Sequence, residues 1–169
     1  MKKIFLLLLI SLSLFGDLVD DGYKNLQKGN YERAHQLWVR ACELNNAKGC
    51  FALGFEYEYG KHVKQSYKKA GEYLLKACSL KDGVSCFRIG VFYEEGWGTF
   101  KNYHKAVEYY KKACSLHVPT GCFQLGHMYY EGLGVRQNKG KAKELFGKSC
   151  DMKYQKGCDN YRILNEQGY

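Results

Sequence analysis

The sequence lacks the short motifs that identify most redox, haem and metal proteins. It contains no C-x-x-C and no C-x-x-C-H, so neither thioredoxin-like chemistry nor c-type haem attachment has support. Zinc sites usually gather cysteines as C-x2–4-C, and this spacing is also missing. No two histidines form a pair such as H-x-x-x-H, and there is no glycine-rich phosphate loop. We therefore expect no metal and no cofactor.

A nucleic-acid-binding pattern is also missing, because no run of basic residues is interleaved with aromatic ones. The formal net charge of +9 instead favours acidic partners, such as anionic polymers or membrane surfaces. We expect no nucleic-acid partner, and a charged, soluble exterior is the simpler interpretation of the same balance.

The longest apolar run, residues 4–15, is too short to span a membrane. It follows the basic leader Met1-Lys2-Lys3, and small residues at Ser13 and Gly16 offer cleavage points. This order predicts a secretory signal peptide over residues 1–16 and a secreted or periplasmic protein without a membrane span. An uncleaved anchor or a buried first helix is the alternative.

The sequence repeats every 36 residues, and the first of its closely similar stretches begins at Cys50. A fixed period of this size is the signature of a solenoid built from stacked helical units. The positions that keep the step are Cys42, Cys78, Cys114 and Cys150; Cys50, Cys86, Cys122 and Cys158; Gly54, Gly90 and Gly126; Tyr57, Tyr93 and Tyr129; and Ala34, Ala70, Ala106 and Ala142.

Apolar residues at helical spacing, separated by glycine-containing breaks, divide residues 17–169 into helical pairs. The pairs cover about 17–45, 48–81, 84–117 and 120–153, and a capping helix follows over 155–167. Arg162 replaces the repeated glycine in that last helix, which suits the polar open end of a stack. The expected fold class is all-α: a right-handed superhelical α/α solenoid of helix-turn-helix repeats. We expect it to be monomeric.

Eight cysteines in an exported chain of this size predict disulfides. Each C-x7-C pair is placed symmetrically about a tight turn, so the two sulfurs face each other where antiparallel helices converge. Equivalent cysteines of successive units lie roughly a helix-packing distance of 8–10 Å apart, which is too far to bridge. The predicted pairs are Cys42–Cys50, Cys78–Cys86, Cys114–Cys122 and Cys150–Cys158.

The pattern L-G-x-x-Y-x-x-G…K-A…K-A-C, as in Ile89-Gly90…Tyr93…Gly96…Lys105-Ala106…Lys112-Ala113-Cys114, resembles the Sel1-like repeat, a relative of the tetratricopeptide repeat. With C-x7-C in every unit and a signal peptide, the chain is similar to the Helicobacter cysteine-rich proteins. That resemblance implies a secreted, disulfide-stapled solenoid, described in the family as penicillin-binding with weak β-lactamase activity.

The residues give little support to a serine hydrolase. Ser66-Tyr67-Lys68-Lys69 matches S-x-x-K, but S-D-N and K-T-G are both missing. The equivalents of Ser66 are Asn30, Asn102 and Asn138, and Ser and Asn are favoured helix N-caps. We interpret Ser66 as a cap, and the catalytic residues of any enzyme here are unknown.

Binding residues are expected on the curved face that helix stacks present, at positions that differ between units. The candidates are Glu56, Arg88, Phe92, Gln124, His127 and Met128. The favoured function is an interaction module for a protein, a peptide or a peptidoglycan-like envelope polymer, with β-lactams as possible ligands. The alternative, supported by resemblance alone, is a weak β-lactamase acting on penicillin-type substrates.

Overall fold

The computed structural model describes residues 18–169, so the predicted signal peptide lies outside the described residues. The described part is helical, without strands, and falls into two compact units that divide between Leu80 and Lys81. None of the described helices is long and apolar enough to cross a membrane.

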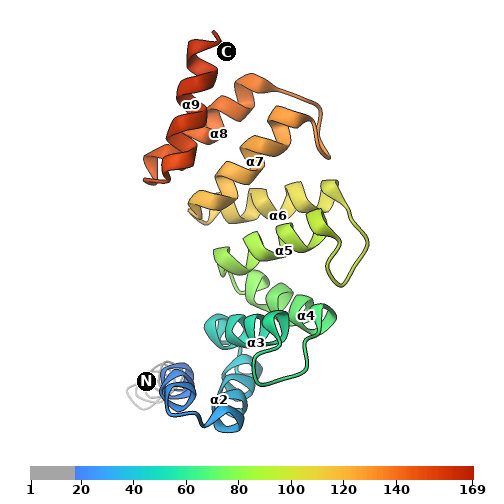
Figure 1. Ribbon diagram of the computed structural model, residues 1–169, viewed down its shortest axis with the longest axis vertical. Helices are drawn as coiled ribbons and strands as arrows, with labels where there is room; N and C mark the ends of the chain where they lie inside the picture. Colours follow the sequence, from blue (N-terminus) through green and yellow to red (C-terminus); the bar gives the residue numbers. More distant parts are fainter. Residues whose placement is uncertain (1–17) are drawn as a thin grey trace, which may run out of the picture. The chain divides into compact units, whose positions relative to one another are not determined.

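The first unit holds a helix over residues 18–27, followed by α2 (Tyr31–Glu43), α3 (Ala47–Tyr59) and α4 (Tyr67–Ser79) (Figure 1). α3 packs against both α2 and α4. The core of the first unit includes Trp38, Cys42, Leu53 and Ala77, which are all almost inaccessible to solvent.

The second unit contains α5 (Gly83–Glu95), α6 (Tyr103–Ser115), α7 (Pro119–Glu131), α8 (Lys139–Asp151) and α9 (Gln155–Glu166). Each helix packs against the next along the chain (Figure 1). Tyr110, Met128 and Leu145 centre one buried cluster, and Phe146 and Leu164 belong to another beside α9. The predicted all-α class is confirmed for the described residues.

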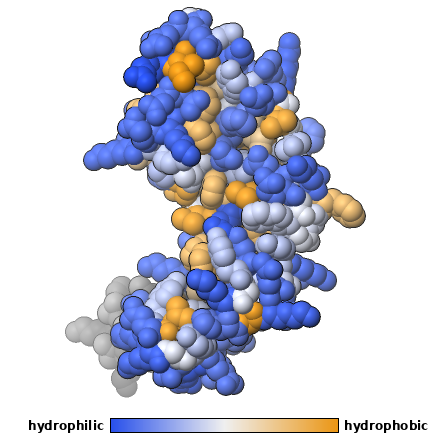
Figure 2. Space-filling view, in the orientation of Figure 1, coloured by the Kyte–Doolittle hydropathy of each residue, from blue (hydrophilic) through white to orange (hydrophobic). Residues whose placement is uncertain are grey.

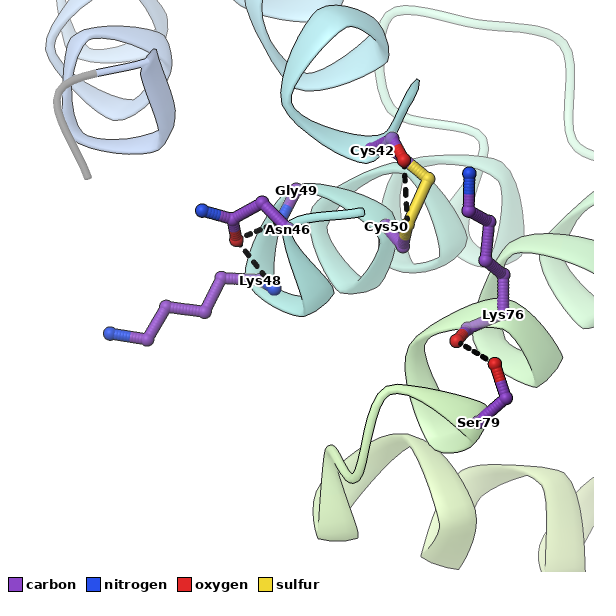
Figure 3. Close-up of a disulfide and its surroundings, with 7 residues drawn as sticks. All are labelled: Cys42, Asn46, Lys48, Gly49, Cys50, Lys76 and Ser79. Carbon is purple, nitrogen blue, oxygen red and sulfur yellow. Dashed lines mark hydrogen bonds between the residues drawn. A yellow bond between two sulfur atoms is a disulfide. The ribbon is translucent and has the colours of Figure 1, made fainter. Parts of the chain in front are cut away.

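Local chemistry sets where the helices begin. The side chains of Ser66, Asn102 and Asn138 accept hydrogen bonds from the backbone N–H three residues later, as N-caps do. Asn30 does not follow this prediction, because its amide nitrogen donates to Asn25 instead. Asn46 supplies a further cap, accepting from the backbone N–H groups of residues 48 and 49 (Figure 3).

Close packing between neighbouring helices explains the repeated glycine. A Cβ at Gly126 would lie 2.8 Å from Phe146 Cε1 and 3.3 Å from the carbonyl oxygen of Ala142. The repeated glycine and alanine predict that α8 approaches Gly126 most closely at Ala142. The tightest contact is instead one turn further along α8, at the large side chain of Phe146, and the glycine leaves room for that ring.

Disulfides join the end of one helix to the first turn of the next. Cys42–Cys50, Cys114–Cys122 and Cys150–Cys158 each have Cα atoms 4.5 Å apart, within the range that a disulfide spans. Cys78 and Cys86 are also disulfide-bonded, and none of the eight cysteines is free. Figure 3 shows Cys42–Cys50 beside the Asn46 cap. The prediction of one disulfide per repeat is confirmed.

A candidate binding groove in the first unit

The first unit is hollowed where α2, α3 and the α3–α4 loop come together. Two hollows of about 840 and 520 Å³ adjoin there and share Tyr31, Glu56 and His62. Tyr23 and Phe55 also line the smaller one. We call the combined feature, defined by these five residues, the first-unit groove. Volumes of this size are typical of ligand sites.

A histidine and a carboxylate meet in this groove. His35 Nδ1 lies 2.6 Å from Glu56 Oε2, which is within hydrogen-bonding distance. The Glu56 side chain is only 5% exposed, whereas that of His35 is 26% exposed and lines the larger hollow. A buried carboxylate needs such a partner, because removal from water is costly for a charged group.

The α3–α4 loop closes over α2 through a ring stack. The rings of Tyr31 and His62 are stacked, with centroids 3.4 Å apart and planes 10° from parallel. His62 has a φ of 68°, a left-handed conformation that is uncommon for residues other than glycine. The stack therefore fixes the histidine over the rim of the groove.

Aromatic rings form the apolar wall. Trp38 is buried at the back of the smaller hollow and lies 5.3 Å, centroid to centroid, from Tyr23. Phe55 contacts the rings of Phe51 and Tyr59 at centroid distances of 6.2 and 4.4 Å. Tyr23, Tyr31, Phe55 and Tyr59 are 39–50% exposed, so much of this aromatic surface faces solvent. Burial, followed by the charge of Asp20, raises the pKa of Tyr23, which keeps its hydroxyl protonated.

The equivalent interface of the second unit is filled. Counting 36 residues twice, the positions of His35 and Glu56 become Val107 and Met128. Both belong to one apolar cluster, which also includes Leu133 of the α7–α8 loop. Leu133 occupies the repeat position that Lys61 has in the first unit. Gly134 replaces His62 with nearly the same φ, 67°, and a Cβ there would lie 2.4 Å from the backbone of Tyr103. The loop therefore docks in the same way in both units, but the first unit has polar groups where the second has its core.

The structure brings only one of the six predicted binding residues, Glu56, into the groove; the other five lie in the second unit. His127 is exposed on α7, and Arg88 and Gln124 are half-buried. Phe92 is 3% exposed and packs edge-on against Trp97, and Met128 is fully buried. Phe92 and Met128 therefore act as core residues, and neither presents a surface to a ligand.

The sequence reasoning missed His35, Tyr31 and His62. No histidine recurs at a repeat position, so each one looks isolated in the sequence. The indication of a site appears only when the 36-residue repeats are aligned. Glu56 takes a position that the other 36-residue repeats give to Phe92, Met128 and Leu164. A carboxylate among apolar equivalents indicates a buried charge, and a partner should then be sought on the preceding helix.

Ser66 caps a helix in the structure. Its hydroxyl accepts from the backbone N–H of Lys69 at 3.3 Å, as the equivalents Asn102 and Asn138 do. This contact gives the serine a structural role like that of its asparagine equivalents. Within residues 18–169 no group of three or more His, Cys, Asp or Glu side chains is arranged to hold a metal ion.

Most of the visible surface is hydrophilic. Figure 2 shows hydrophilic residues over much of the face in view, with hydrophobic residues in separate small patches. Scattered apolar residues of this kind are normal on protein surfaces. The first-unit groove therefore differs from the rest of the surface in its hollow shape, its His35–Glu56 pair and its ring contacts.

Comparison with known proteins matches four consecutive Sel1 repeats to residues 16–46, 47–82, 83–118 and 119–154. A Helicobacter pylori protein named "Putative beta-lactamase HcpD" is 42% identical over 72 residues. That match covers 38% of this chain and 24% of HcpD, so the chain spans about a quarter of that relative.

Solved structures agree with this match. Cysteine-rich protein B of Helicobacter pylori (HcpB) is 34% identical, with 82% of this chain and 93% of that one covered and a TM-score of 0.59. A protective antigen of uropathogenic Escherichia coli with an SLR fold gives a TM-score of 0.85 at 24% identity, covering 91% of this chain and 34% of that one. A Sel1 repeat protein of Oxalobacter formigenes gives 0.83 at 23% identity, covering 89% and 62%. The last two show the fold alone.

Proposed function

This chain belongs to the Sel1 repeat family, within the cysteine-rich group represented by HcpB, and we propose that it is an exported interaction module whose first-unit groove binds a segment of a partner polypeptide. A disulfide-stapled Sel1 repeat protein is suited to protein interaction, because its helical pairs form a rigid support for exposed side chains.

Export is supported by the oxidised cysteines and by the leader-like sequence of residues 1–16. Disulfides persist in oxidising compartments and are rare in the bacterial cytosol. All eight cysteines are bonded, a state that an oxidising environment maintains. Alkaline phosphatase fused after residue 30 should be active in bacterial cells, because this enzyme needs the periplasm to form its own disulfides. Inactivity of the fusion would contradict export.

One observation carries the binding proposal: the interface that is filled by Val107 and Met128 in the second unit borders a hollow in the first, where it holds the His35–Glu56 pair. Aromatic side chains such as Tyr and Trp are enriched at protein interfaces, and this groove exposes several of them beside a buried polar pair. An apolar wall with few polar groups is the usual composition of a recognition site.

Selection of random peptides displayed on phage against the oxidised full chain tests this function. Phe55→Asp should abolish binding of the selected peptides, since Phe55 is exposed and lines the groove. Ile163→Asp is a matched control, because Ile163 takes the same repeat position on α9 and is similarly exposed at 46%. Equal loss in both variants, or loss in neither, would contradict binding at the groove.

A cell-envelope polymer is the second kind of partner that the sequence suggests. Co-sedimentation of the protein with purified peptidoglycan sacculi measures this directly. If Phe55→Asp still binds the sacculi, the polymer binds at a surface other than the groove. A polypeptide would then not be the only partner of this protein.

Weak hydrolysis of β-lactams is the alternative function, and one contact favours it. Glu56 holds the imidazole of His35 in the way that a carboxylate orients a general base. Such a base would take a proton from water as the hydroxyl oxygen adds to the lactam carbonyl, and would return that proton to the lactam nitrogen as the C–N bond breaks. Nitrocefin turnover should then fall in His35→Gln and persist in Ser66→Ala. Turnover at background level in the purified wild-type protein would reject the alternative.

A further inference from the structure

The groove contains a specific recognition element, a carboxylate in a hollow that aromatic rings line. Glu56 borders both hollows, and Tyr31, Trp38 and Phe55 line the smaller one with it. His35 contacts one carboxylate oxygen, Oε2. Aromatic faces attract cations through their quadrupole, and a carboxylate adds a full opposite charge.

The other repeats fold with an apolar residue at this position. The same repeat position is occupied by Phe92, Met128 and Leu164, each at most 3% exposed. Ion pairs in protein interiors are often no more stabilising than apolar side chains of similar volume. Retaining Glu56 is therefore explained better by recognition than by stability.

We propose that the first-unit groove receives a lysine or arginine side chain of the partner polypeptide, with Glu56 as its charge partner. Long basic side chains suit this shape, because their aliphatic stems pack on apolar surface while the charged head seeks a polar group. The stem lies along Phe55 and Tyr23, and the head reaches the carboxylate beside Trp38. This inference rests on the proposed function and names the chemistry that the groove selects.

Lys61 is a cationic side chain that such a ligand would meet in the groove. It lines the smaller hollow, is exposed, and stands where the second unit has Leu133. Its ammonium group carries the same charge as the ligand, and Arg33 adds another at the edge of the larger hollow. Removal of Lys61 takes away a like charge and should therefore tighten binding. Because Lys61 is exposed and salt screens exposed charges, the gain should be largest at low salt.

Trp38 provides a direct readout in a Trp97→Phe background, because the sequence has only two tryptophans. The probes are three acetylated and amidated pentapeptides, Ala-Ala-X-Ala-Ala, in which X is lysine, norleucine or glutamate. We expect the lysine peptide to change Trp38 emission at concentrations at least tenfold lower than the norleucine peptide. Glu56→Gln should remove this tenfold preference, and Lys61→Ala should increase it.

Glu94→Gln serves as the control, because Glu94 is a half-buried carboxylate of the second unit that accepts a hydrogen bond from Tyr110. It should leave the preference unchanged, and far-UV circular dichroism checks that each variant folds. Equal binding of lysine and norleucine, tighter binding of glutamate, or saturation by none of the peptides would overturn the proposal. Selected phage peptides that depend on Phe55 but lack lysine and arginine would overturn this inference while supporting the proposed function.

Discussion

Between α2 and α3, the side chains of His35 and Glu56 meet, whereas the same repeat positions between α6 and α7 hold Val107 and Met128 in a closed apolar cluster. The backbones around these positions are alike: helices of 13 residues, a left-handed glycine at the C-cap of α3 and of α7, and a loop that folds back onto the preceding helix. The repeat therefore fixes the backbone and leaves the interface between helices free to be core or site. Changes that exchange the two interfaces test this interpretation.

The largest effect is expected when the polar residue is moved into the second unit. Met128→Glu places a carboxylate in a fully buried cluster where Val107 offers no hydrogen bond. An uncompensated buried charge costs about 3–5 kcal/mol, so the free energy of unfolding should fall by that amount. Urea denaturation of the oxidised protein measures it. Adding Val107→His should recover part of the loss, because it restores the partner that Glu56 has.

If Met128→Glu costs less than about 0.5 kcal/mol, the second interface is not a closed core, since surface substitutions have effects of that size. The comparison between the two units would then lose its basis. Met128→Leu is the volume control, because apolar exchanges of similar volume usually cost less than about 1.5 kcal/mol.

The disulfides should affect the two units equally. Replacing Cys114 and Cys122 by serine releases a loop closed by a sequence separation of 8, and replacing Cys42 and Cys50 releases one of the same size. On the chain-entropy account each loss costs about 2–3 kcal/mol. Thermal unfolding of the two double variants should give similar decreases in Tm. A decrease more than twice as large in one unit would show that the bonds also serve different local structures.

The converse exchange should stabilise the first unit. His35→Val with Glu56→Met gives it the residues of the α6–α7 interface, and replacing both partners of a buried hydrogen bond by apolar side chains is nearly neutral or stabilising. We expect a gain of about 1 kcal/mol, the usual size of such effects, because apolar burial replaces the desolvation of a carboxylate that is only 5% exposed. Peptide binding at the groove should be lost at the same time. A less stable double variant would mean that the pair holds the unit together.

The fold was predictable from the sequence because it depends on features that recur. The 36-residue step, the glycine at the C-caps of α3, α5 and α7 and the paired cysteines all report on backbone geometry, which is the same in each repeat. The groove was less predictable, because it depends on departures from the repeat. Glu56 was selected as a departure, but its partner lies 21 residues earlier on α2, and no local spacing connects the two.

Phe92 and Met128 are buried, although the sequence predicts them as binding residues. That prediction depends only on the fact that each residue differs from its equivalents in the other repeats. Difference between apolar residues reports only how each core is filled, since cores tolerate exchanges that keep their volume. A change in polarity at a buried position, as at Glu56, is the informative kind.

The smallest effect concerns the helix caps, where the two units should again agree. Ser66→Ala removes the hydroxyl that accepts from Lys69, and Asn138→Ala removes the amide oxygen that accepts from Lys141. Loss of a cap costs about 1 kcal/mol, so both variants should lose a similar amount in urea denaturation. Ser66→Asn should retain most of the stability, because asparagine performs the same role at residues 102 and 138. If Ser66→Asn instead lost nitrocefin turnover while keeping its stability, Ser66 would be a nucleophile, because a cap can be replaced by asparagine and a nucleophilic hydroxyl cannot.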